Sequence, residues 1–271
     1  MQIDAALDYA RKYEMEALVA ARDGTTFAQE YAGTFAAATP HALYSGTKSF
    51  WGPTALCAQS DGLLDLDEPV ADTIESWRDD PWERHVTLRM LLSLTAGFGF
   101  GGLGSAVPTY DRALSMTLKN DPGSTFTYGG ISLQVFGAVF ARKLMSRRQT
   151  PHEYLRERVL QPTGVTIAKW RALADGTQPL PTGAFLTAAN WLAYGNYVLR
   201  QWDSLRACLT GSPVNPRYGL GWWLRPSGDV AYASGSGGQA LYVIPAHDLV
   251  VVRFGKSASY KHEAFLKRLA L

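Results

Sequence analysis

Cysteine is scarce in this chain, and the two cysteines present have no metal-knuckle or redox spacing. Among 271 residues only Cys57 and Cys208 occur, each between small or aliphatic neighbours. A C-x-x-C pair or a Cys/His cluster is the usual signature of a zinc or redox site, and neither is found. We therefore interpret both cysteines as reduced, buried thiols. The five histidines also lack metal-ligand spacing, so we expect no metal and no organic cofactor.

The chain also has almost no excess of charge and no long apolar run. Lys and Arg total 26 against 24 Asp and Glu, without a basic cluster, so we expect no nucleic acid and no anionic membrane as a partner. No stretch approaches the ~18 apolar residues of a membrane span. Met1–Ala5 lacks the basic start of a signal peptide. These absences predict a cytoplasmic protein; the oligomeric state stays open.

Strand patterns gather at the two ends of the chain. Ala17–Ala21 and Thr25–Tyr31 flank Asp23-Gly24, a pair that suits a tight hairpin turn. Neither this hairpin nor a C-terminal meander is large enough to be stable alone, so we expect them to join in one antiparallel sheet. The meander consists of four short runs rich in apolar and β-branched residues: Leu220–Leu224, Val230–Ala233, Leu241–Ile244 and Leu249–Phe254.

The middle of the chain has helical periodicity. Apolar residues from Leu133 to Leu144 recur at intervals of three and four. Shorter patterns cover 88–94, 153–160 and 188–199, and a final helix is expected over Tyr260–Leu271. We predict a single α+β domain with an antiparallel sheet flanked by helices in a lobe of about 1–50 and 200–271. An all-helical lobe of about 51–199 is inserted, and the site is expected in the cleft between the lobes.

Ser45 and Lys48 are the first candidates for catalysis. A helix is expected to begin here, and residues three apart share a helix face. A serine hydroxyl becomes a nucleophile when a base takes its proton, and a buried lysine of lowered pKa can be that base. Alone, the spacing also fits an N-cap serine followed by a surface lysine. Pro53 removes the helical hydrogen bond to the Ser49 carbonyl and should bend this helix.

Three further segments follow this Ser-x-x-Lys in a recognisable order. They are Asp61–Val70, Val86–Phe98 and Pro122–Tyr128. The succession resembles the serine β-lactamase and penicillin-binding-protein superfamily from about residue 17 to residue 254. It is closest to the branch of class C β-lactamases, D-aminopeptidases, esterases and 6-aminohexanoate-oligomer hydrolases. The resemblance implies a β-lactamase-like fold and an acyl-enzyme formed on Ser45, with Lys48 handling the proton.

The resemblance also implies a role for Tyr128. Tyr128-Gly129-Gly130 looks like the Tyr-x-Asn motif of this branch. Tyr128 would then share the proton with Lys48 and later return it to the leaving group. A phenol of pKa ~10 needs a nearby cation to ionise near neutrality, and Lys48 could supply that field. The alternative is a tyrosine that only packs at the start of the following helix.

A third motif lies near the C-terminus. Ala233–Gln239 looks like the Lys-Thr-Gly strand that edges the cleft in this superfamily. By that match the backbone N–H groups of Ser45 and Ser236 form the oxyanion hole. Gly235 and Gly237 are expected to bind substrate, because small residues let it approach the backbone closely. The alternative is a glycine-rich hairpin loop.

Two departures from the family pattern bear on the substrate. Gly130 stands where the motif has Asn, and Ala233 stands where it has Lys. In β-lactamases and penicillin-binding proteins those side chains help to hold the β-lactam amide and carboxylate. We therefore favour an esterase or amidase acting on a small-molecule ester, amide or lactam without that carboxylate. The alternatives are a true β-lactamase or D-aminopeptidase, and a catalytically decayed binding protein.

Two other segments are candidates for lining the cleft. Gly97–Gly102 matches G-x-G-x-x-G but follows a helical pattern, which argues against a dinucleotide site. We expect a flexible loop there, with Phe98 and Phe100 as an apolar wall beside the substrate. Trp223 precedes the last strands and is a further candidate for substrate binding.

Overall fold

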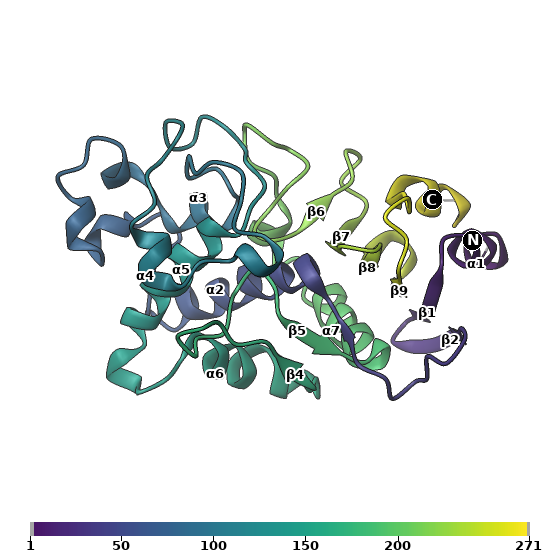
Figure 1. Ribbon diagram of the computed structural model, residues 1–271. Coiled ribbons are helices and arrows are strands. Elements are labelled where there is room, and N and C mark those ends of the chain that lie inside the picture. Colours follow the sequence, from purple (N-terminus) through teal and green to yellow (C-terminus); the bar gives the residue numbers. More distant parts are fainter. Residues whose placement is uncertain (1–2, 270–271) are drawn as a thin grey trace.

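The computed structural model describes residues 3–269 and contains a six-stranded antiparallel sheet in the order β2-β1-β9-β8-β7-β6 (Figure 1). Antiparallel pairing of β1 with β9 joins the two ends of the chain, which confirms the predicted sheet. Its strands are β1 (Met15–Arg22), β2 (Thr25–Tyr31), β6 (Trp223–Leu224), β7 (Ala231–Gly235), β8 (Gln239–Ile244) and β9 (Leu249–Gly255).

The β1–β2 connection is the predicted two-residue turn. Asp23 and Gly24 both have positive φ, 50° and 74°, the mirror-image turn geometry that matches the twist of paired strands. Strand β1 is buried on both faces, which explains its continuous apolar run. One face carries Ala17, Val19 and Ala21, and the other carries Leu18 and Ala20.

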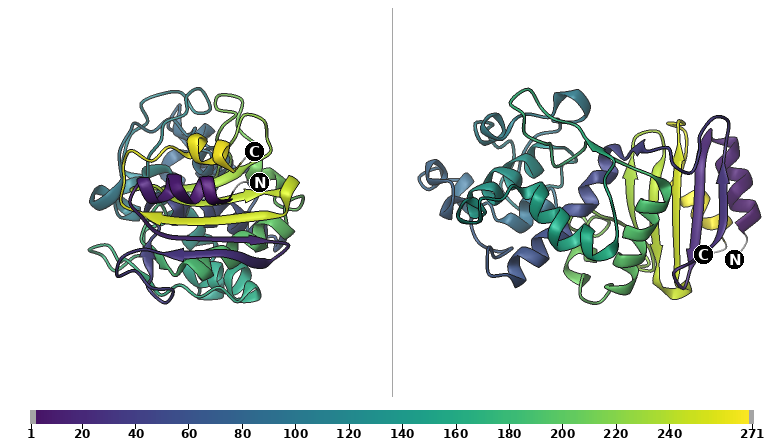
Figure 2. Two further views of the ribbon diagram at one scale, coloured as in Figure 1. Left: turned by 90° about the vertical axis from the view of Figure 1, so that its right-hand side faces the viewer. Right: turned by 90° about the horizontal axis from the view of Figure 1, so that it is seen from below.

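Helices cover both faces of this sheet (Figure 2). Helices α1 (Ile3–Lys12) and α8 (His262–Arg268) pack on one face, and α7 (Ala188–Arg200) packs on the other. The helices expected over 188–199 and near the C-terminus are therefore confirmed. The last two residues of the expected C-terminal helix lie outside the described residues.

The chain between β2 and β6 is helical and irregular, with a short second sheet in the order β3-β5-β4. This sheet was not predicted, because strands of two or three residues are too short to show periodicity. No helix within residues 3–269 is long and apolar enough to cross a membrane. The elements are β3 (His41–Ala42), α2 (Trp51–Ser60), α3 (Leu88–Leu92), α4 (Tyr110–Leu114), α5 (Ile131–Lys143), α6 (Pro151–Leu155), a π-helix (Arg156–Leu160), β4 (Lys169–Trp170) and β5 (Ala184–Leu186).

The expected strand Leu220–Leu224 is largely absent, since only its last two residues form β6. Gly221 has a φ of 85°, and a Cβ at this position would lie 2.3 Å from the Lys48 carbonyl oxygen. The chain therefore bends at Gly221 to pass close to the backbone of Lys48. Extended strand geometry begins only after this contact.

Pro53 acts on the helix as expected through its missing N–H. The chain from Tyr44 to Phe50 is a 3-10 helix, η1, which becomes α-helical as α2 from Trp51. The Ser49 carbonyl, which lacks its helical donor, instead accepts from the Tyr194 hydroxyl at 2.7 Å and the Trp222 indole at 3.0 Å. Two elements far along the chain are thereby tied to the turn that carries Lys48.

Candidate active site

Ser45 and Lys48 lie one turn apart in η1. The preceding residue, Tyr44, has a left-handed backbone with a φ of 48°, and it turns the chain from β3 into the helix. A 3-10 helix has three residues per turn, so Ser45 and Lys48 are eclipsed on one face. The Lys48 Nζ lies 3.0 Å from the Ser45 Oγ. The pair is thus adjacent, in a tighter helix than the sequence suggests.

Burial determines the protonation of the Lys48 amine. The residue is 1% exposed, and among the described residues it has no carboxylate partner. Its second hydrogen bond is donated to the Pro181 carbonyl at 3.3 Å. Loss of hydration disfavours an ammonium ion, and burial lowers the pKa of Lys48 to about 7. A large fraction of the amine is therefore neutral near pH 7 and able to accept the Ser45 proton.

Tyr128 adjoins both residues. Its ring centroid is 4.8 Å from the Lys48 Nζ, and the ring stacks on Trp223 at 5.4 Å. Burial raises the pKa of the Tyr128 phenol, and hydrogen bonds with Ser45 and Trp223 only partly oppose this effect. The Tyr128 pKa is therefore not lowered as the sequence analysis expects, because burial of the phenol is the largest effect on it. The phenol stays protonated and is a hydrogen-bond donor, not a phenolate base.

The predicted oxyanion hole uses the backbone amides of Ser45 and Ser236. Ser236 follows the last residue of β7, and Ser45 is the second residue of η1. Within the described part of the chain neither amide donates to a protein acceptor. A Cβ on Gly235 would lie 2.1 Å from the Leu43 carbonyl oxygen. Glycine at this position therefore allows the end of β7 to approach the residues that precede Ser45.

These groups open onto one cavity of about 430 Å³. Five predicted residues line it, and three lining residues were missed. Tyr232 and Ser234 alternate along β7 with buried alanines, and His262 comes from α8. The lining consists of Ser45, Tyr128, Trp223, Tyr232, Ser234, Gly235, Ser236 and His262. Ser234 falls inside the Lys-Thr-Gly-like segment and could have been identified there; no sequence pattern marks His262.

Two predicted substrate-binding residues do not line this cavity. Phe98 is 4% exposed and packs in the core beside Trp77, with ring centroids 6.4 Å apart. Gly237 lies in the β7–β8 turn with a φ of 79°, and a Cβ there would lie 2.9 Å from the Gly255 carbonyl oxygen. Turn geometry and packing against β9 explain this glycine. Phe98 and Gly237 therefore lie outside the lining of this cavity, and their substrate-binding roles stay predictions.

The glycine in place of the motif Asn has a steric cause. A Cβ on Gly130 would lie 1.9 Å from the Gly102 carbonyl oxygen. The Gly130 N–H donates to the Gly101 carbonyl at 2.9 Å, and Gly101 forms a parallel bridge with Gly129. The glycine-rich loop is thus packed on the Tyr128 segment and fills the space an Asn side chain would need. Ala233 is buried among apolar residues of the core.

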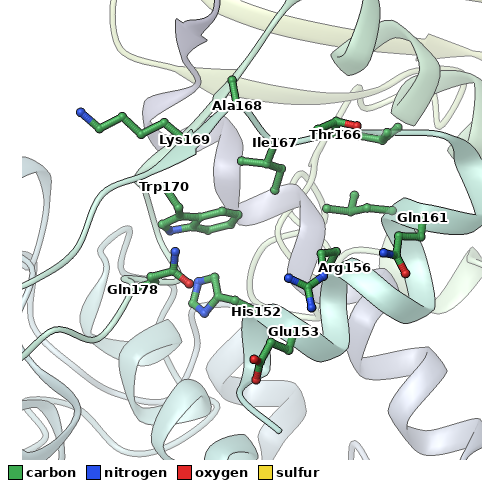
Figure 3. A pocket seen from close by; sticks show the side chains of 12 residues that line it. His152, Glu153, Arg156, Gln161, Thr166, Ile167, Ala168, Lys169, Trp170 and Gln178 are labelled. Carbon is green, nitrogen blue, oxygen red and sulfur yellow. The ribbon is translucent and has the colours of Figure 1, made fainter.

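A second cavity, of about 450 Å³, lies between the α6 segment and β4 (Figure 3). His152, Arg156 and Trp170 are prominent in it, and burial lowers the pKa of His152 to about 3. Thr166 is the hydroxyl residue in its lining, and among the described residues no side-chain hydrogen bond joins Thr166 to a histidine or lysine. Its lining residues do not include any member of the Ser45 site.

The described residues also lack a metal centre. No group of three or more His, Cys, Asp or Glu side chains within residues 3–269 is arranged to hold an ion. Cys57 and Cys208 are both free thiols, the first partly exposed and the second buried. Only Cys208 therefore matches the predicted burial in full.

Replacing Lys48 by Met should stabilise the fold while removing the base. Burial lowers the pKa from 10.5 to about 7, so the unfolded chain holds a proton that the native chain has lost between these values. Wild-type stability therefore rises with pH across this window. We expect Lys48→Met to raise the free energy of unfolding at pH 7 by about 1–3 kcal/mol after the lost hydrogen bonds are counted, and to remove the rise of this free energy with pH that Lys48 causes. Denaturant unfolding at pH 7 and pH 9 measures both effects, and Lys169→Met, at an exposed lysine, is the control. An equal change in the free energy of unfolding between the two pH values for wild type and Lys48→Met would contradict the prediction.

Replacing Gly130 by Ala should disturb the Tyr128 segment. The added Cβ collides with a backbone carbonyl, so we expect a loss of about 2 kcal/mol or more. Gly99→Ala in the same loop is the matched control, because its nearest contact is the flexible Lys119 side chain at 3.2 Å. We expect that control to change stability by about 0.5 kcal/mol or less. Equal melting temperatures for the two variants would refute the packing argument.

Comparison with solved structures supports the fold. A proposed 6-aminohexanoate-dimer hydrolase from Bacillus anthracis is similar with a TM-score of 0.79 and 17% identity, over 97% of this chain and 79% of that chain. A D-stereospecific amidohydrolase from Streptomyces sp. gives 0.75 and 16%, over 97% of both chains. The hydrolase EstCE1, with promiscuous acyltransferase activity, gives 0.75 and 15%, over 98% and 97%. These identities establish likeness of fold alone.

A search of curated proteins returns no match. The family model described as Beta-lactamase matches residues 11–270, which includes every element from β1 to α8. The resemblance carried by the sequence motifs and the likeness to solved structures agree with this match. The chain belongs to the Beta-lactamase family.

Proposed function

We propose that this protein is a serine hydrolase that cleaves an ester or amide bond of a small molecule through an acyl-enzyme on Ser45. One observation carries the proposal: the Lys48 amine is buried, has a pKa lowered to about 7, and lies 3.0 Å from the Ser45 Oγ. A nucleophile beside a base of matched pKa is the arrangement that activates a hydroxyl near neutral pH.

The first half of the reaction follows from this arrangement. The Ser45 Oγ attacks the substrate carbonyl carbon while its proton passes to the neutral Lys48 Nζ. The carbonyl oxygen becomes an oxyanion, which the N–H groups of Ser45 and Ser236 stabilise. The protonated Tyr128 phenol donates to the leaving oxygen or nitrogen as the bond to carbon breaks, and Lys48 returns a proton to the phenol. The acyl group then remains on Ser45.

Water completes the cycle. It attacks the acyl carbonyl, gives its proton to Lys48, and the same two amides hold the second oxyanion. Collapse of this intermediate releases the carboxylic acid, and the Ser45 Oγ recovers its proton. Every proton in this scheme moves between Ser45, Lys48, Tyr128, substrate and water, so the proposed reaction needs no metal or organic cofactor.

The cavity favours esters and amides over carboxylate-bearing β-lactams. No lysine or arginine is among its lining residues, and Gly130 and Ala233 replace the motif side chains that hold the β-lactam amide and carboxylate. The carboxylate of a β-lactam would therefore be desolvated in this cavity without a cationic side chain to pair with it. The cavity volume suits a small molecule rather than a polymer segment.

Covalent labelling tests the nucleophile. We expect a fluorophosphonate probe to label the wild type and to leave Ser45→Ala unlabelled, with Ser60→Ala as a folded control that still reacts. A naphthyl ester should be turned over at least about ten times faster than nitrocefin. Absence of labelling would favour a catalytically decayed binding protein, and faster nitrocefin turnover would favour a true β-lactamase.

The pH dependence tests the base. Lys48 is active in its neutral form, so kcat/KM for an ester should rise about tenfold per pH unit at low pH and level off above about pH 7. Because kcat/KM reports on the free enzyme, the inflection of this profile gives the pKa of Lys48 in the enzyme without substrate. A profile that is flat from pH 5 to pH 9, or a Lys48→Arg variant with wild-type kcat/KM, would show that another group is the base.

A further inference from the structure

A chain of four hydrogen-bonding side chains begins in the cavity and runs into the core beneath α8. The Ser234 Oγ lies 2.8 Å from the His262 Nε2. On the other side of the imidazole, the His262 Nδ1 lies 2.7 Å from the Tyr242 hydroxyl. That hydroxyl lies 3.0 Å from the hydroxyl of Tyr260. Of its four members, Ser234 and the adjacent His262 line the cavity.

The imidazole in this chain is uncharged. Burial, with a smaller effect of Arg253, lowers the pKa of His262 to about 4. Tyr232 packs on one side of the ring at 4.8 Å between centroids. At neutral pH His262 therefore carries one N–H and one unprotonated nitrogen, and its neighbours determine which nitrogen holds the proton.

Counting protons gives the direction of the chain. Tyr242 and Tyr260 are both buried. Within residues 3–269 the Tyr260 hydroxyl has no hydrogen-bond partner except Tyr242. A buried O–H left without an acceptor is destabilising, so Tyr260 donates to Tyr242. Tyr242 must then donate to the His262 Nδ1.

The remaining proton positions follow. With its Nδ1 accepting, His262 carries its proton on Nε2 and donates it to the Ser234 Oγ. The Ser234 hydroxyl proton then has no acceptor in the protein and faces the cavity. The reverse direction would leave the buried Tyr260 proton without an acceptor. The hydrogen bond between Tyr260 and Tyr242 thus sets the direction of the whole chain, and the Ser234 hydroxyl acts as a hydrogen-bond donor toward the cavity.

We infer that His262 is a positioning residue that makes Ser234 a hydrogen-bond donor to the substrate, and that the substrate carries a second, uncharged acceptor besides its scissile carbonyl. This inference rests on the proposed function of Ser45. An uncharged acceptor is specified because no lysine or arginine lines the cavity to offset the desolvation of a carboxylate. A ketone, ester or amide carbonyl meets this requirement.

The strand geometry limits where that acceptor lies. Ser234 lies on β7, and Ser236, the second proposed oxyanion donor, is the turn residue two positions later, so the chain separates their Cα atoms by at most roughly 7 Å. The acceptor should therefore be separated from the scissile carbonyl by about two methylene groups or their equivalent. Either the acyl or the alcohol part of an ester can place it there.

Two matched ester pairs test the inference. One is 1-naphthyl pentanoate against 1-naphthyl 4-oxopentanoate, and the other is butyl acetate against 3-oxobutyl acetate, followed in a pH-stat. We expect the wild type to prefer the ketone member of at least one pair by about 3- to 10-fold in kcat/KM. Ser234→Ala and His262→Phe should reduce this ratio to near one, and the surface variant His247→Phe should retain it.

The ratio separates positioning from a structural effect, because damage to the fold lowers both members of a pair together. No preference in the wild type, or a full preference in Ser234→Ala, would overturn the inference.

Nitrogen NMR of histidine-labelled protein tests the proton direction without any turnover. We expect the Nε2–H tautomer for His262 from pH 6 to pH 8, assigned by loss of its signals in His262→Phe. An Nδ1–H tautomer or a protonated ring would refute the inference. If no ester shows Ser45-dependent hydrolysis, the proposed function fails by itself, and this spectrum still decides the orientation of Ser234.

Discussion

The burial of one amine without a counter-ion is the constraint on which the site depends. Within residues 3–269 the polar partners of the Lys48 amine are the Ser45 hydroxyl and the Pro181 carbonyl, and the Tyr128 ring lies against it. Loss of hydration destabilises the ammonium form and thereby makes a base available near pH 7. The fold bears this destabilisation because the surrounding helices and sheet bury a large apolar core. Burial of the Lys48 amine thus lowers the stability of the fold at the residue that we propose as the base.

Close backbone contacts also shape this region. Three glycines, at positions 130, 221 and 235, lie where any side chain would collide with a carbonyl oxygen of another segment. The carbonyls belong to Gly102, Lys48 and Leu43. The contacts of Gly221 and Gly235 place the approach to β6 and the end of β7 against the η1 segment. The contact of Gly130 packs the glycine-rich loop on the Tyr128 segment. Positioning in this site is therefore achieved largely by main chain, which has fewer ways to rearrange than side chains.

The cavity that results is polar without being charged. Its hydroxyl, phenol, indole and imidazole groups are able to form single hydrogen bonds, each of modest strength. Such a site discriminates by shape and by matched donors and acceptors, not by attraction of a carboxylate. The absence of the motif Asn and Lys side chains fits this character, because the space of the first is filled by the 97–102 loop and the second faces apolar core.

The sequence by itself determined the sheet from both chain ends, the principal helices, and the Ser45–Lys48 pair, because strand alternation, turn residues and motif spacing are local signals. Only the tertiary structure decided that Phe98 packs in the core whereas Trp223 lines the cavity, that the Tyr128 phenol stays protonated, and that His262 reaches the site from the last helix. Each of these depends on burial and on neighbours distant along the chain. Burial alters a pKa or hides a ring through the atoms around it, and no local pattern in the chain records which atoms those are.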